Sequence, residues 1–119
     1  MSAHQEQLTQ LYLSGEHEQL HEIAAALELE PWLHLVRTKR RYEEAFEQTR
    51  KARSEALDRM ARRDYVARHH GTVWLDRVAY ARAQQRSAQQ QLEQALIDAK
   101  IDLNAHSWHD LAWTGGNNV

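Results

Sequence analysis

Cysteine is absent from this chain of 119 residues, and its absence limits the chemistry that the protein can perform. Without a thiol there is no disulfide framework, no thiolate metal site and no cysteine nucleophile. Any zinc ion would have to bind through histidine and carboxylate side chains. A chain without cysteine is compatible with a reducing compartment, and we expect a cytoplasmic location.

Glycine and proline are also scarce, with four residues and one residue respectively, and the strand-favouring valine, isoleucine and threonine are few. Alanine, glutamine, glutamate, leucine and arginine dominate the sequence, and all five have high helix propensity. We therefore predict an all-α protein. A chain of 119 residues suits one domain with one modest core.

Long apolar runs are missing as well. The first twenty residues contain histidine and glutamate rather than a basic start followed by an apolar stretch. No later stretch approaches the roughly 20 apolar residues that cross a bilayer. We expect no export signal, no membrane span and no membrane partner.

Apolar residues recur at helical spacing in four successive segments. The predicted helices cover about residues 2–13, 16–29, 32–70 and 72–103. Gly15 follows the first helix, where glycine commonly ends a helix. Pro31 suits the first turn of the third helix, and Gly71 separates the third helix from the fourth.

The two long helices should fold back at Gly71 as an antiparallel hairpin. In this register Thr49 lies opposite Leu92, and Phe46 lies opposite Leu96. The polar, alanine-rich middles of the two helices then also face each other. Two helices alone expose most of their surface, so the short N-terminal helices must cover part of the seam, or a second copy must complete a four-helix bundle. We favour a homodimer.

A single helical domain is expected over residues 1–113. Its expected parts are the acidic N-terminal helices (1–30), the helical hairpin (31–103) and a short C-terminal helix or turn (104–113), followed by a flexible tail (114–119). Ser107 and Asp110 have the spacing of a capping box, which predicts a helix start at this point.

The net charge of −2 hides an uneven distribution along the chain. Residues 1–30 carry six acids and no lysine or arginine, whereas residues 31–70 carry eleven bases against six acids. Either the acidic segment lies against the basic helix and neutralises it, or the basic face is free to meet nucleic acid or an acidic partner.

The string His17-Glu18-Gln19-Leu20-His21 resembles the HExxH motif of zinc metallopeptidases. In that motif two histidines one helical turn apart bind zinc, and the glutamate between them activates the bound water. The resemblance covers five residues and implies zinc ligation by His17 and His21, with Glu18 as the base. The third ligand has no recognisable motif.

A second resemblance is to the helix-turn-helix of DNA-binding proteins. The apolar residues that follow its pattern are Leu20, Ile23, Ala24, Leu27 and Leu29. The resemblance implies a basic second helix that faces phosphate through Arg37, Lys39, Arg40 and Arg41. The chain departs from the motif at Glu28, where the turn usually has glycine, and at Pro31.

No glycine-rich phosphate loop and no set of nucleophile, acid and base is recognisable, so we do not expect an enzyme, a cofactor or a metal. The favoured hypothesis is a non-catalytic helical interaction protein, a small regulator, adaptor or inhibitor that binds another protein. Nucleic-acid binding by the third helix is the alternative, and a zinc metallopeptidase is the third hypothesis. The candidate partner-binding residues are Arg40, Arg41, Arg50, Lys51, Trp108 and Trp113.

Overall fold

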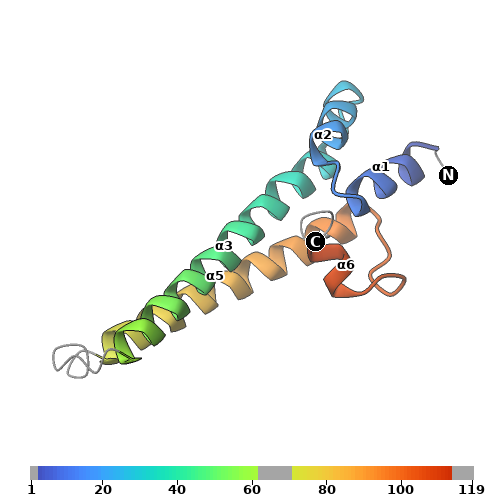
Figure 1. Ribbon diagram of the computed structural model, residues 1–119. Coiled ribbons are helices and arrows are strands. Elements are labelled where there is room, and N and C mark those ends of the chain that lie inside the picture. The colour runs from blue at the N-terminus through green and yellow to red at the C-terminus, as the bar shows by residue number, and fades with distance from the viewer. Residues whose placement is uncertain (1–2, 62–70, 114–119) are drawn as a thin grey trace. The chain divides into compact units, whose positions relative to one another are not determined.

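The computed structural model describes residues 3–61 and 71–113, and over these ranges it contains helices and no strand. The helices are α1 (Ala3–Leu13), α2 (His17–Ala26), α3 (Glu30–Ala61), α5 (Gly71–Asp98) and α6 (Trp108–Ala112) (Figure 1). The predicted all-α class, with two long antiparallel helices and two short N-terminal ones, is confirmed. Among the described helices, none combines the length and apolarity that crossing a membrane requires.

The chain divides into two compact units. The terminal unit consists of Met1–Lys39 and Leu92–Val119, and the hairpin unit consists of Arg40–Gln91. Both long helices contribute to both units. The predicted stretch of helix over residues 62–70 and the predicted tail over residues 114–119 lie outside the described residues.

The terminal unit holds most of the large buried side chains. Its almost wholly buried residues include Leu8, Tyr12, Leu20, Leu35, Leu96 and Leu111, so every described helix contributes to this core. Two side chains of α1 also bond to the C-terminal part of the chain. The Tyr12 hydroxyl donates to the Leu111 carbonyl oxygen at 2.5 Å, and Gln5 Nε2 donates to the Ala99 carbonyl oxygen at 3.0 Å.

Three helices of the terminal unit end in the same way, with one residue in the left-handed conformation. These residues are Gly15 (φ 79°) after α1, Glu28 (φ 55°) after α2 and Lys100 (φ 63°) after α5. In each case the next amide N–H bonds back to a carbonyl five residues earlier, which is the Schellman arrangement. The predicted helix end at Gly15 is confirmed.

The predicted end of the last long helix, near Leu103, is wrong: α5 ends at Asp98. Lys100 takes the left-handed conformation, and the Ile101 N–H donates to the Leu96 carbonyl oxygen at 3.0 Å. Ile101 is buried. The chain therefore turns back so that Ile101 joins the core, and this burial outweighs the helical spacing that continues to Leu103.

In the hairpin unit, the buried residues of α3 are spaced seven residues apart along the sequence. They are Tyr42, Thr49 and Ala56. The buried Ala81 and Ala88 of α5 have the same spacing. A seven-residue repeat keeps one face of each helix against its neighbour along its length. Most of these side chains are small, so the seam supplies limited apolar contact.

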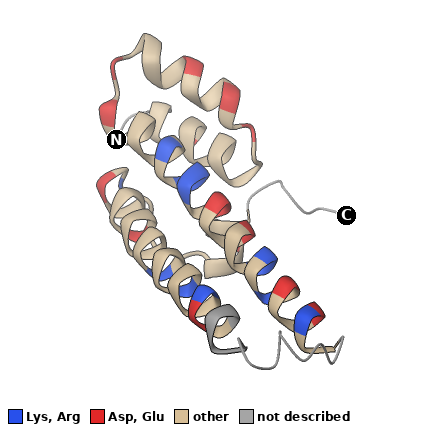
Figure 2. Ribbon diagram, turned by 90° about the vertical axis from the view of Figure 1, so that its left-hand side faces the viewer, with Lys and Arg blue, Asp and Glu red and all other residues tan. Residues whose placement is uncertain are grey.

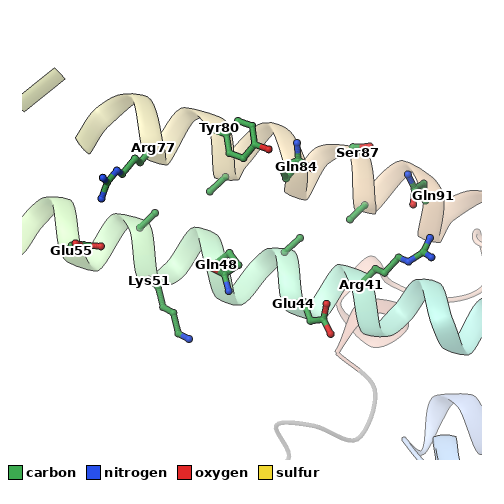
Figure 3. Close-up of a pocket in the computed structure, with 14 residues that line it drawn as sticks. Arg41, Glu44, Gln48, Lys51, Glu55, Arg77, Tyr80, Gln84, Ser87 and Gln91 are labelled. Atoms are coloured by element: carbon green, nitrogen blue, oxygen red, sulfur yellow. The ribbon is translucent and has the colours of Figure 1, made fainter. Parts of the chain in front are cut away.

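The predicted register of the hairpin is wrong. Thr49 was expected opposite Leu92, but Figure 3 shows the neighbouring Gln48 across from the stretch between Tyr80 and Gln84. Thr49 therefore lies about ten residues away from its expected partner along α5, which is close to three helical turns. The prediction placed the hairpin turn at Gly71, whereas Gly71 is the first residue of α5, so the turn was placed too late in the chain.

Candidate interaction grooves

A groove of about 870 Å³ runs along one side of the hairpin unit between α3 and α5 (Figure 3). We call it the alanine groove because its lining includes Ala45, Ala52, Ala81 and Ala88. The two alanines of α5 are buried, and the two of α3 are half-buried. At these four positions the groove is lined by methyl groups and not by long side chains.

Charged side chains of both signs border the alanine groove. They are Arg41, Glu44, Lys51, Glu55 and Arg77. Figure 3 shows Arg41 reaching from α3 toward Gln91 of α5 at one end, and Arg77 reaching from α5 toward Glu55 of α3 at the other. Three bases and two acids leave this lining almost balanced in charge.

A second groove, of about 540 Å³, lies on the other side of the hairpin unit. Its described lining includes Arg50, Arg53, Arg82 and Arg86 and no acid, and we call it the arginine groove. Phe46 and Leu57 add apolar surface to it. On α3 these residues point about half a turn away from those of the alanine groove, since successive residues of a helix are about 100° apart.

One arginine of this groove already has a partner on its own helix. Arg50 bonds Glu47 at two points, with Nε at 3.1 Å from Oε2 and Nη2 at 2.9 Å from Oε1. This hydrogen bonding lowers the pKa of Glu47 below its usual value and raises the pKa of Arg50. Over the described ranges, Arg53, Arg82 and Arg86 form no ion pair.

The four predicted basic residues do not form one patch. Arg41 and Lys51 line the alanine groove, Arg50 lines the arginine groove, and Arg40 is exposed but lines neither. Sequence reasoning missed Arg82 and Arg86. Their spacing of four residues places both on one face of α5, but only the register of the hairpin shows which face of α3 they meet.

The predicted tryptophan patch lies in the terminal unit. Trp108 and Trp113 are both half-buried and stand at the two ends of the short helix α6. The predicted helix start is confirmed, because the Ser107 hydroxyl oxygen accepts a hydrogen bond from the Asp110 N–H at 3.1 Å. Both tryptophans interact with other groups of the protein, and their role in partner binding stays a prediction.

The HExxH string occupies the first turns of α2. The His17 ring stacks on the Tyr12 ring, with centroids 5.3 Å apart, and His21 is exposed. Within residues 3–61 and 71–113, no group of three or more histidine, aspartate or glutamate side chains is arranged to hold a metal ion. The described residues therefore supply no third zinc ligand for the metallopeptidase hypothesis.

The turn between α2 and α3 lies where the helix-turn-helix resemblance places a turn, between Ala26 and Glu30. Glu28 adopts the left-handed conformation in which that motif usually has glycine. The basic surface is smaller than predicted, however. Lys39 is only 2% exposed, and Arg37 Nη2 lies 2.6 Å from Glu30 Oε1. Arg40 and Arg41 remain as exposed bases on this part of α3.

The six acids of residues 1–30 are all exposed. Figure 2 shows acidic residues on α2 and both charge signs on the long helices. Glu30 pairs with Arg37 of the same helix, α3. It stays a prediction that the acidic segment neutralises the basic residues of the hairpin unit.

These features define an all-α protein with a helical hairpin and an open groove on each side of its hairpin unit. Comparison with protein-family models, with curated proteins and with solved structures finds no match to this chain.

Proposed function

We propose that this protein is a non-catalytic interaction protein that binds a helical protein surface in the alanine groove. The observation that carries the proposal is the combination of an alanine floor with walls of both charge signs. A helix can approach closely where the groove presents alanine, because the methyl side chain is short. Glutamate, lysine and arginine at the edges can pair with opposite charges on the incoming helix, as at the edges of coiled coils.

A second copy of the chain is the partner that best fits this groove. Walls with both charge signs are self-complementary, which a twofold dimer interface requires. Two helices bury only part of their surface, and pairing two hairpins would complete a four-helix bundle. An exposed apolar side chain in the lining supports this arrangement, since Tyr80 is 68% exposed.

A role as a small regulator, adaptor or inhibitor is part of the same proposal, since a protein without catalytic chemistry acts through what it binds. A cytoplasmic location is also proposed, and the absence of cysteine supports it.

The test is light scattering coupled to size-exclusion chromatography over a range of protein concentrations. The variant Q48K/Q84K places two positive charges in the groove. A twofold dimer would bring four positive charges together at its interface. We expect its dimer to dissociate at least about tenfold more readily than the wild-type dimer. The control Q10K/Q90K adds the same charge at exposed positions outside the groove lining and should dimerise like the wild type.

A wild-type protein that stays monomeric up to about 100 μM would contradict the assignment of a second copy to this groove. Equal weakening by both double variants would show that net charge, and not the groove, controls association.

A further inference from the structure

The arginine groove differs from the alanine groove in its unbalanced charge. Its described lining brings four arginines together from two helices and includes no acid. Glu47 pairs with Arg50 from outside this lining, and the other three arginines form no ion pair over the described ranges. Like charges at this density repel one another, so an anion bound in the groove would reduce this repulsion.

The four arginines are spread along the groove and are not gathered around one point. Arg82 and Arg86 are separated by about 6 Å along α5, and Arg50 and Arg53 by about 4.5 Å along α3, at 1.5 Å per residue. The groove extends from Phe46 to Leu57 on α3, which corresponds to about 16 Å. Repeated positive charge along an elongated groove matches a linear polyanion.

We propose that the arginine groove binds the phosphate backbone of a single nucleic-acid strand. The guanidinium group presents a planar fork that bonds phosphate oxygens at two points. Proteins that bind single strands combine a basic groove with aromatic rings on which bases stack, and Phe46 supplies a half-buried ring in this lining. The site is separate from the alanine groove and does not depend on the proposed dimer.

The net charge of −2 does not prevent this binding. At physiological salt, charges are screened over about 8 Å, so the residues next to the strand control its affinity. An acidic protein segment offers carboxylates without stackable bases, and it would make no use of the apolar ring. A nucleic-acid strand therefore matches both the arginines and the aromatic ring of the lining, whereas an acidic peptide matches only the arginines.

The experiment measures fluorescence anisotropy of a labelled oligothymidylate of about 20 nucleotides, titrated with the full chain between 50 and 200 mM salt. Four phosphate contacts predict a log–log salt slope of about −2.8 for the wild type. R82Q/R86Q should bind at least about tenfold more weakly and show about half this slope. R40Q/K100Q removes the same charge from exposed positions outside both grooves and should retain both affinity and slope.

A third variant should strengthen binding. Glu47 holds Arg50 in a two-point bond, so E47Q frees this arginine for phosphate and should tighten binding by at least about twofold. Circular dichroism checks that each variant retains its helices. Light scattering on protein without DNA reports the dimer separately, so a failure of one proposal is distinguishable from a failure of the other.

Three results would overturn the assignment. The first is no binding of the oligonucleotide at 50 mM salt. The second is an equal loss in R82Q/R86Q and R40Q/K100Q, which would mean that net charge alone attracts DNA. The third is tighter binding of a labelled polyglutamate peptide than of DNA, abolished in R82Q/R86Q, which would assign the groove to an acidic protein segment.

Discussion

At the scale of single residues, the two non-glycine residues in the left-handed conformation deserve a direct test. Glu28 and Lys100 occupy positions where glycine has no steric cost, and a residue with a side chain is strained there by about 1 kcal/mol or more. Both keep this conformation because the following residues, Leu29 and Ile101, are held by the backbone bonds that end each helix.

We predict that K100G stabilises the protein by about 0.5–1 kcal/mol, because it relieves the strain at a position that glycine suits. K51G, at an exposed position inside α3, should instead destabilise it by about 1 kcal/mol. Urea unfolding followed by circular dichroism measures both. Similar destabilisation by the two variants would show that the turn at Lys100 is not left-handed in solution.

The buried Tyr12 hydroxyl gives a second prediction at this scale. Y12F removes the bond to the Leu111 carbonyl oxygen and leaves this acceptor without its partner, so we expect a loss of about 1–2 kcal/mol in the free energy of unfolding. Y80F makes the same chemical change at a residue that is 68% exposed, and it should alter stability by less than about 0.5 kcal/mol. Equal values for the two variants would contradict the buried bond.

At the scale of elements, α6 shows how a very short helix is held in place. It has five residues, too few for a helix that is stable alone. Its start is capped by Ser107, and its Leu111 and Ala112 are buried in the terminal unit. The cap and the buried face together account for its formation.

We predict that S107A destabilises the protein by about 1 kcal/mol, because the Asp110 N–H loses its acceptor. S87A, inside α5, should have no effect or stabilise the protein slightly, since alanine is the better helix former. Thermal unfolding measures both changes. A neutral S107A would mean that burial of Leu111 alone holds the helix.

At the scale of the whole molecule, the two units differ in how their apolar residues are buried. The terminal unit encloses large side chains such as Leu20, whereas the hairpin unit leaves Leu57 64% exposed and Met60 53% exposed. The chain thus buries most of its large apolar side chains in the terminal unit and leaves more of them exposed in the hairpin unit.

We predict a loss of about 2–5 kcal/mol for L20A, which creates a cavity in the core. L57A should change stability by less than about 0.5 kcal/mol. Chemical denaturation at two protein concentrations measures both effects. A large, concentration-dependent loss for L57A would show that this face is covered in an oligomer, and it would conflict with an open arginine groove.

The sequence by itself determined the helical class, the number of short N-terminal helices, the helix break at Gly15 and the cap at Ser107. These features depend on composition, on apolar spacing and on local hydrogen bonds between residues close in the chain. Local interactions of this kind can be read from neighbouring residues without knowledge of the rest of the fold.

Only the tertiary structure decided the register of the hairpin, the end of α5 and the division of the basic residues between two grooves. Arg50 and Arg82 are distant in sequence, and their proximity depends on how α3 and α5 align. From the sequence, Lys39 is expected at the surface because lysine is charged, but the structure buries it. Burial and alignment depend on packing between distant segments, which periodicity along one helix does not specify.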